Sequence, residues 1–408
     1  MKTFSITLIS TVLLAIFVAR LTMSVESKAR ILPDLGEEIE VVVCSVTSAR
    51  TSSLRNSELV SNIVNGLPKD VQVLILVNDR DVFKTKSSNN RVKFIELPEQ
   101  IGISIWPQDP FIVVNNRQTT RLITPCVFDR EDDHVMPTSL GKQLNLEVVR
   151  SKLHFEGGNI VCGEEAVLIG VNSILLNSEL FNESQDAIEA RFEKLLGRPV
   201  IVVGDKGQEI PHIDLIITPL GGKRVAVADS RLGATIAQQA LEDSPEDVLR
   251  FEETCENEFF GRSDVTEIVD KSGNSILRPQ VVGQTLRSIE ASIAAADQLD
   301  QMANQLSREG YQVFRIPALV PDLTPEFDES GREKPGYPFI TFNNVLIETN
   351  SGAPVVYLPQ YGCTALDLAG VDYWKKIGFS VKTIPGFATS AMYGGSLRCC
   401  TKVLLRKR

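Results

Sequence analysis

Val281–Arg308 reads VVGQTLRSIEASIAAADQLDQMANQLSR, and Tyr311–Ile316 follows it as YQVFRI. Apolar residues recur at helical spacing along the first stretch, which holds few helix breakers, and Gly310 provides a C-cap. The second stretch is short and largely apolar, which is typical of a buried strand. A long amphipathic helix that leads directly into a strand predicts the α/β class.

Strands and helices keep alternating on both sides of this pair. Long linkers are missing between residues 39 and 408, so we expect one domain there, preceded by a polar linker over residues 25–38. The acidic, irregular stretch Phe251–Ser275 is expected to be an excursion loop. The remaining predicted helices are Leu54–Leu67, Ser184–Leu196 and a short one over Trp374–Phe379. The remaining predicted strands are Glu40–Val46, Val71–Leu76, Arg91–Leu97, Phe111–Val114, Ala166–Ile169, Val200–Val203, Ile213–Thr218, Val225–Ala228, Asn344–Glu348, Pro354–Leu358 and Val403–Leu405.

An uncharged apolar run, Phe4–Ala19, opens the chain after Lys2 and ends at Arg20. It predicts a signal peptide or a membrane anchor over residues 1–24, and hence a secreted or membrane-anchored protein, with a cytoplasmic location as the alternative. The run is short for a membrane span, which needs roughly 20 residues.

The composition narrows the classes of function. The formal net charge is −10, and the absence of an overall basic field argues against nucleic acid and anionic lipid as partners. The 7 cysteines include no C-x-x-C pair, so neither a zinc site, a thioredoxin-like site nor a disulfide scaffold is predicted. The 3 histidines leave few candidates for proton transfer near neutral pH: His134, His154 and His212.

Two short motifs place a carboxylate in a constrained backbone. Trp106-Pro107-Gln108-Asp109-Pro110 holds an aspartate between prolines, and taken alone it indicates a turn with a capping aspartate. His154-Phe155-Glu156-Gly157-Gly158-Asn159 contains paired glycines that let the backbone approach another group closely. Taken alone, this second motif indicates an ordinary turn before a strand.

Two further motifs supply a histidine, a second aspartate and a cysteine. Pro211-His212-Ile213-Asp214 opens an apolar run, and on a strand His212 and Asp214 would project from the same face. Alone, the pattern indicates a hydrogen-bonded His–Asp pair. Gly394-Gly395-Ser396-Leu397-Arg398-Cys399-Cys400-Thr401 puts a thiol between two glycines and the final strand, which suits an exposed nucleophile, although a buried structural cysteine fits the motif alone.

Together the four motifs match the chemistry of a guanidinium group. Its planar fork of N–H donors fits two carboxylates, which can hold it and leave its central carbon exposed. The bound cation lowers the pKa of a nearby thiol, and the resulting thiolate attacks that carbon. A histidine then protonates the departing amine and later activates water.

The order W-x-x-D, E-G-G-N, H-x-D and G-G-x-x-x-C-x-T resembles the pentein superfamily of guanidino-modifying enzymes. The nearest resemblance is to the catalytic domain of the protein-arginine deiminases, in which a helix running into an I-P step precedes an asparagine-bearing strand, as do Gln298–Pro317 and Phe339–Ile347 here. The resemblance covers residues 39–408. It implies a five-fold pseudo-symmetric α/β propeller of ββαβ units with the site in a central cleft.

The resemblance also implies roles for individual residues. It makes Cys399 the nucleophile, rather than Cys400, because the family spacing C-x-T points to Thr401. The other implied roles are a general acid and base in His212, guanidinium-binding carboxylates in Asp109 and Asp214, and substrate-side or histidine-orienting contacts from Glu156 and Trp106.

Two departures from the family pattern bear on cofactors and on the residue before the nucleophile. Several relatives place histidine where this chain has Arg398, although arginine deiminases also carry arginine there. The chemistry requires no cofactor. Calcium is the one metal left open, because Gln108 matches a calcium ligand of the vertebrate enzymes, but Ile112 stands where those enzymes carry an acidic ligand. The acidic cluster Asp129–Asp133 is expected to be solvated surface, since it lacks the ligand spacing of a calcium loop.

The implied activity is deimination of arginine in a peptide or protein, giving citrulline and ammonia. Three alternatives stay open: deimination of free arginine or agmatine, amidinotransfer to an amine, and a non-catalytic binding module on the same fold. The presence of a cysteine, a histidine and two aspartates at the motif positions argues against the binding module. A papain-like protease is disfavoured because there the cysteine precedes the histidine.

Overall fold

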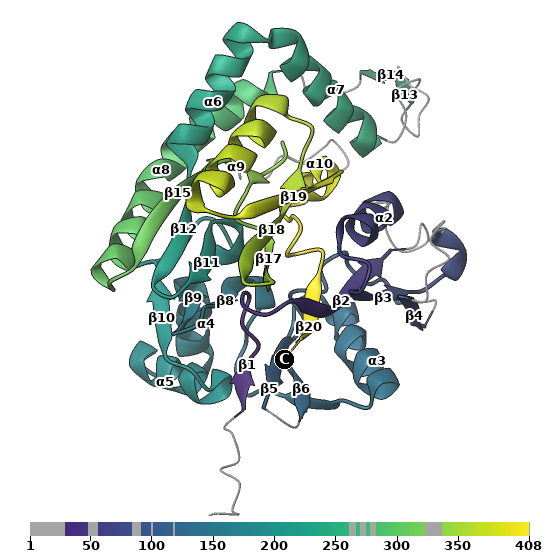
Figure 1. Ribbon diagram of the computed structural model, residues 1–408, viewed down its shortest axis with the longest axis vertical. Coiled ribbons are helices and arrows are strands. Elements are labelled where there is room, and N and C mark those ends of the chain that lie inside the picture. Colours follow the sequence, from purple (N-terminus) through teal and green to yellow (C-terminus); the bar gives the residue numbers. More distant parts are fainter. Residues whose placement is uncertain are drawn as a thin grey trace, which may run out of the picture.

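The computed structural model describes residues 29–47, 56–83, 91–98, 101–116, 119–260, 267–269, 275–277, 283–322 and 337–407. The predicted signal peptide or anchor over residues 1–24 lies outside this range, as does the first part of the predicted linker. No helix within these residues has both the length and the apolar character of a membrane span. The fold is mixed α/β, with several separate sheets, as the sequence predicts (Figure 1).

Five sheets hold most of the strands in the described part of the chain. The first sheet has the strand order β20 (Lys402–Arg406), β2 (Ile39–Val46), β3 (Gln72–Val77) and β4 (Val92–Glu96), and the second has the order β1 (Arg30–Ile31), β5 (Ile112–Asn115), β6 (Thr120–Thr124) and β7 (Glu147–Arg150). The third consists of β8 (Ile160–Cys162), β9 (Val167–Gly170) and β10 (Val200–Val203), and the fourth of β11 (Ile217–Gly221), β12 (Arg224–Asp229), β15 (Gln312–Leu319) and β16 (Ile340–Thr341). The fifth consists of β17 (Leu346–Asn350), β18 (Ala353–Gln360) and β19 (Ser380–Pro385). A small ladder joins β13 (Glu267–Val269) and β14 (Ser275–Leu277).

The same connectivity recurs in all five sheets. In each sheet, two strands form an antiparallel pair, and a third strand runs parallel to the second member of that pair. The antiparallel pairs are β20–β2, β5–β6, β8–β9, β11–β12 and β17–β18. The third strands are, in the same order, β3, β7, β10, β15 and β19. The parallel strands need a crossover, and a helix supplies it each time. The crossover helices are α2 (Ser57–Gly66), α3 (Val135–Leu144), α4 (Val171–Phe181) with α5 (Gln185–Leu196), α6 (Ser230–Asp243) with α7 (Pro245–Phe260) and α8 (Gln284–Arg308), and α9 (Thr364–Ile377). The order of elements therefore matches ββαβ units.

The last strand, β20, lies in the same sheet as β2, the second strand of the described chain. Figure 1 shows the yellow C-terminal strand β20 beside the purple strand β2. The pair is antiparallel, with Val42 opposite Val403, and Val42 is fully buried. Because β20 follows directly after the Gly394–Thr401 motif, this pairing fixes the position of the predicted nucleophile relative to the start of the chain.

Short 3₁₀ helices and one small α-helix complete the element list. They are η1 (Arg80–Val82), η2 (Glu131–His134), η3 (Gly157–Asn159), η4 (Ile213–Leu215) and α10 (Ala388–Met392). Of these, η3 and η4 lie in the predicted motifs, and η2 lies in the acidic cluster.

Most predicted strands are present, but the prediction for Ile213–Thr218 is wrong in its first half. Residues 213–215 form η4, closed by Leu215 N–H donating to His212 O and Ile216 N–H donating to Ile213 O. Strand β11 begins only at Ile217. A continuous apolar run is compatible with a buried strand or a buried helical turn, which is why periodicity did not distinguish them.

One helix, α9, is longer than predicted, and others, α7 among them, were not predicted. Part of the expected excursion loop, residues 251–260, belongs to α7, whose buried Val248, Phe251 and Cys255 follow helical spacing. The short helix expected at Trp374–Phe379 is the end of α9, which terminates at Gly378 in the left-handed conformation. Helices α3, α4 and α6 have no counterpart among the predicted elements.

Candidate active site

The predicted site residues all lie just before the first strand of a sheet unit. Asp109 precedes β5, Glu156 precedes β8, His212 and Asp214 precede β11, and Cys399 precedes β20. Residues far apart in the sequence are thereby brought to the same ends of their units. These side chains lie close together in the structure, and their catalytic roles stay predictions.

Asp109 is held by the backbone of the second motif and by an arginine. Its carboxylate is buried, and Oδ1 accepts a hydrogen bond of 3.0 Å from Gly158 N–H. Oδ2 accepts from Arg130 Nη2 at 2.7 Å. The Asp109 carbonyl also accepts from Gly157 N–H at 3.0 Å. The W-x-x-D and E-G-G-N motifs thus form one structural unit.

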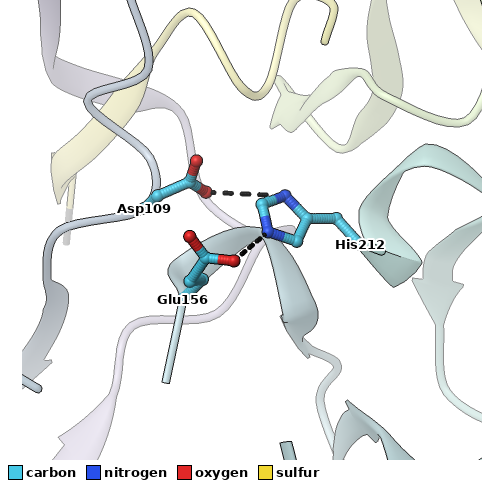
Figure 2. Close-up of side chains that lie close together, drawn as sticks. All are labelled: Asp109, Glu156 and His212. Carbon is cyan, nitrogen blue, oxygen red and sulfur yellow. Dashed lines mark hydrogen bonds and ion pairs between the residues drawn. The ribbon is translucent and has the colours of Figure 1, made fainter. Parts of the chain in front are cut away.

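The imidazole of His212 lies between two carboxylates (Figure 2). Its Nε2 is 2.7 Å from Glu156 Oε2, and its Nδ1 is 3.8 Å from Asp109 Oδ1. Burial works against the charged form, but Asp109 and Glu156 outweigh it and raise the pKa of His212 to about 9. The imidazole therefore carries a proton at neutral pH, as a general acid must before it gives one to a leaving group.

Glycines make this close approach possible. A Cβ at Gly158 would lie 2.5 Å from His212 Nδ1 and 2.9 Å from Asp109 Oδ1, so any side chain there would displace the site. A Cβ at Gly395 would lie 2.3 Å from the ring of Trp106. The paired glycines after Glu156 were predicted to allow close approach, and the structure confirms this at Gly158.

Cys399 is buried, so the expectation of an exposed thiol is wrong, and its sulfur faces a carboxylate and an amide. Sγ lies 3.7 Å from Asp214 Oδ2 and 3.9 Å from Oδ1, and 3.1 Å from Asn344 Nδ2. Burial, followed by the charges of Asp214 and Asp109, raises the pKa of Cys399 well above its usual range. The resting state therefore holds a thiol, and a bound cation is required to favour the thiolate.

Asp214 already has a cationic partner inside the protein. Arg398 Nη1 donates to Asp214 Oδ2 at 2.7 Å, while its Nε donates to Asp34 Oδ1 at 2.9 Å and its Nη2 to Ile160 O at 2.9 Å. Burial raises the pKa of Asp214, and Arg398 and His212 oppose that rise. The arginine that departs from the family pattern is thus a buried counter-ion for the second predicted guanidinium-binding carboxylate.

Arg130 brings a second guanidinium into the site, where sequence analysis predicted solvated surface. It contacts Asp109, Asp133 Oδ2 at 2.9 Å and Glu156 Oε1 at 3.6 Å. Asp133 is 1% exposed and also accepts from Ser104 N–H at 2.7 Å. The prediction for Asp129–Asp133 is wrong at these two positions, because pairing between the charges permits their burial.

Asp109, Glu156 and His212 could also be considered as metal ligands, since their donor atoms lie within 4.8 Å of one another. The two carboxylates, however, face opposite ring nitrogens of His212, and a histidine coordinates one ion through one nitrogen (Figure 2). The Arg130 guanidinium already contacts both carboxylates. The geometry therefore favours an ion-paired imidazolium over a metal site.

A small cavity of about 30 Å³ adjoins this cluster. Asp34, Gln108, Gly157, Arg398 and Lys402 are among its lining residues. Lys402 donates to Gln108 O at 2.9 Å, and burial together with Arg398 lowers its pKa to about 7. Lys402 therefore ties β20 to the loop that carries Asp109.

The sequence did not identify Arg130 or Asn344 as part of the cluster, and it did not predict that Arg398 pairs with Asp214. Arg130 stood in a charge run, and charge runs are usually solvated. Asn344 lay within Phe339–Ile347, which contributed to the resemblance but received no role. The position of Asn344 in the chain could have indicated its role. It stands just before β17, the first strand of its sheet unit, and each predicted site residue likewise stands just before the first strand of its own unit.

No protein-family model and no curated protein sequence matches this chain. Solved structures resemble it over most of its length. A Cys→Ser variant of the agmatine deiminase of C. jejuni with substrate bound has a TM-score of 0.60 at 15% identity, covering 93% of this chain and 97% of its own. The agmatine deiminase of Enterococcus faecalis has a TM-score of 0.60 at 14% identity, covering 92% and 95%. A protein named only provisionally as a peptidyl-arginine deiminase has a TM-score of 0.60 at 16% identity, covering 93% and 100%.

Proposed function

Because the chain has the fold of the pentein superfamily, we propose that it is a deiminase that hydrolyses the guanidinium group of a small substrate, agmatine or free arginine, through a covalent intermediate on Cys399. One observation carries the proposal. The sulfur of Cys399, the carboxylate of Asp214 and the Asp109–His212–Glu156 triplet converge from segments spread over nearly the whole chain.

The first step is binding and activation. The substrate guanidinium lies between Asp109 and Asp214, and its Nη groups donate to their carboxylates. Arg130, whose side chain is 36% exposed, yields its place on Asp109 to the substrate. The added positive charge lowers the pKa of the Cys399 thiol, which releases its proton to solvent, since His212 is already protonated.

The second step is substitution at carbon. The thiolate adds to the central carbon, a C–S bond forms, and a C–N bond breaks after His212 transfers its proton to the departing nitrogen. Ammonia leaves, and an S-linked amidino adduct remains. Neutral His212 then takes a proton from water, hydroxide adds to the carbon, and the C–S bond breaks. The products are a ureido compound and the free thiol, so one water is consumed and one ammonia released.

The small-molecule substrate takes precedence over the peptide that the sequence alone favoured. Two of the similar structures are named agmatine deiminases, and one of them holds its substrate. The provisional name of the third keeps peptidyl-arginine as the second candidate. Both share the chemistry above and differ in what surrounds the guanidinium.

Two further parts of the proposal concern architecture and cofactors. The five ββαβ units close into a five-fold pseudo-symmetric propeller, with the strand-preceding loops gathered at its centre. No metal takes part, and calcium leaves the rate unchanged.

The test is a substrate panel on the full-length protein. Agmatine, free arginine and an arginine-containing peptide are each incubated with and without calcium, and ammonia and ureido product are measured. We expect product from agmatine or arginine, none from Cys399→Ser, and full activity from Cys400→Ser. Product from the peptide alone would transfer the function to protein-arginine deimination. No ammonia from any of the three would overturn the proposal.

A further inference from the structure

Two turns from different sheet units bring the sulfur of Cys399 against the carboxylate of Asp214. Asp214 lies in η4, which precedes β11, and Cys399 lies in a turn before β20 in which Cys400 N–H donates to Ser396 O at 2.9 Å. Because the two turns belong to separate units, the distance between the sulfur and the carboxylate depends on contacts between units.

A chain of hydroxyl groups joins these two turns. At the η4 end, Thr341 Oγ1 donates to the carbonyl of Leu215. The hydroxyl of Tyr361 donates to Thr341 O at 2.5 Å and accepts from Thr341 N–H at 3.3 Å. At the other end, Ser396 Oγ lies 2.8 Å from the same Tyr361 hydroxyl. All three side chains are buried, so water does not compete for these bonds.

The direction of the bond between Tyr361 and Ser396 follows from the partners of the phenol. A phenol carries one hydrogen, and a backbone carbonyl can only accept, so the Tyr361 hydroxyl donates to Thr341 O and accepts from Ser396 Oγ–H. The Tyr361 ring packs edge-to-face against Phe342, with the ring centroids 5.7 Å apart. Tyr361 thus offers Ser396 an acceptor at a fixed position.

We propose that Tyr361 and Ser396 are positioning residues, which hold the turn of the nucleophile so that the sulfur of Cys399 faces Asp214. Both act through Cys399. This proposal rests on the proposed function of the site and adds to it two residues to which the sequence motifs assigned no role.

The position of Ser396 also affects the charge on the sulfur. Burial and the carboxylates of Asp214 and Asp109 raise the pKa of Cys399, whereas a hydrogen bond from the Ser396 backbone lowers it. Hydrogen bonds to a charged acceptor are strong, and they weaken steeply when distance and angle change. Without the Tyr361 hydroxyl, the turn loses an anchor, and the thiolate loses part of this stabilisation.

Tyr357 provides a matched control. It is a second buried tyrosine, in the adjoining strand β18, and its hydroxyl donates to Glu348 Oε1 at 2.6 Å. Its replacement by phenylalanine also removes one buried hydroxyl and takes a donor from a polar partner. That hydrogen bond connects β17 and β18, whereas the bond of Tyr361 reaches the turn of the nucleophile.

The experiment measures the rate at which iodoacetamide alkylates Cys399 in the full-length protein, without substrate, with peptide fragmentation to distinguish Cys399 from Cys400. Below the pKa of a thiol, this rate is proportional to the fraction of thiolate. We expect Tyr361→Phe and Ser396→Ala each to lower the rate at about pH 8 by about three- to tenfold, which corresponds to a rise of about half to one unit in the pKa. Tyr357→Phe should leave the rate at its wild-type value.

The double variant Tyr361→Phe/Ser396→Ala tests whether the two residues act through one hydrogen bond. If they do, its rate should be no lower than that of the slower single variant. Folding is checked by melting temperature and circular dichroism, and Ser396→Ala decides the question if Tyr361→Phe does not fold. An unchanged or faster rate in a folded single variant, multiplied effects in the double variant, or an equal loss in Tyr357→Phe would overturn the proposal.

Steady-state kinetics of Tyr361→Phe gives a second readout. The variant leaves Asp109 and His212 in place, so KM should change by less than about twofold while kcat falls by about tenfold. A rise in KM with an unchanged kcat would overturn the positioning role. Failure of the proposed function is seen separately, as absence of turnover by the wild-type protein, because alkylation requires no substrate.

Discussion

At the scale of single residues, the protein's own Arg130 presents a guanidinium to Asp109, one of the two carboxylates that the substrate is proposed to use. Both oxygens of Asp109 are engaged, one by Gly158 N–H and one by Arg130. A substrate guanidinium that binds Asp109 must therefore compete with Arg130, whose side chain is 36% exposed.

This competition predicts the effect of Arg130→Gln. Without the internal guanidinium, the substrate no longer has to displace a charged partner from Asp109, and KM should fall severalfold. Steady-state kinetics with the preferred substrate tests this, with Arg121→Gln, which removes an exposed arginine paired to Glu147, as the control. A KM that rises instead would mean that Arg130 binds the substrate.

The proton on His212 predicts the basic limit of activity. Protonated His212 is required to expel ammonia, and its pKa is raised to about 9, so kcat should decline as the pH rises through about 9. Glu156→Gln removes one of the three carboxylates that raise this pKa, the others being Asp109 and Asp214, and the decline should move to lower pH. A kcat–pH profile measures both, and superimposable basic limbs for the two proteins would contradict the account.

The same shift has a consequence for stability. The folded pKa of His212 lies above its ordinary value of 6.5, so the ion pairs stabilise the fold fully below pH 6.5 and progressively less as the pH rises to about 9. Denaturant titration of the wild-type protein and of His212→Asn, at pH 6.5 and at about pH 9, measures how much the charge of His212 contributes to the free energy of unfolding. The difference between the two proteins should shrink as the pH is raised.

At the scale of elements, short loops before the first strands hold the cluster, and buried ion pairs connect one loop to another. Arg398, before β20, pairs with Asp214, before β11, and bonds to Ile160 O at the start of β8. The cluster is therefore assembled by contacts between loops of different units, in addition to the hydrogen bonds within each sheet.

Arg398→Met should destabilise the fold by about 3–5 kcal/mol, because it leaves the carboxylate of Asp214 buried without its counter-ion. The double variant Arg398→Met/Asp214→Asn should lose less than the sum of the two single variants. Urea unfolding of all four proteins completes the cycle. Additive losses would show that the pair is not coupled.

At the scale of the whole molecule, β20 and the arginine near its end connect the N-terminal segment to two sheets. Arg406 is 7% exposed and donates to four backbone carbonyls, those of Pro33, Asp34, Glu37 and Ile347. These acceptors lie in the segment before β2 and in β17. One side chain thus connects the segment before β2 with β17.

Arg406→Met should therefore lower the free energy of unfolding by about 2 kcal/mol, because four backbone carbonyls lose a charged hydrogen-bond donor. Lys407→Met, at the next position, removes an exposed side chain paired with Glu38 and Asp70 and should change stability little. Denaturant unfolding compares the two variants. Equal losses would contradict the role assigned to Arg406.

The sequence predicted the class of fold, most strands and the residues that converge, because these depend on apolar periodicity and on motifs with fixed spacing. It did not predict η4, since an apolar run such as Ile213–Ile217 fits a buried strand and a buried turn equally. It also placed Arg130 and Asp133 on the surface, since ion pairing between distant loops is invisible in local charge patterns. Asn344 was missed for the same reason, because only the fold brings it to Cys399.

The central claim is attack by Cys399 on a guanidinium carbon. The most direct measurement is the mass of the protein after acid quenching during turnover of agmatine or arginine, followed by peptide fragmentation. The account predicts an amidino adduct on Cys399 and none on Cys400, lost in Cys399→Ser. An adduct on another residue, or ammonia release that persists in Cys399→Ser, would contradict it.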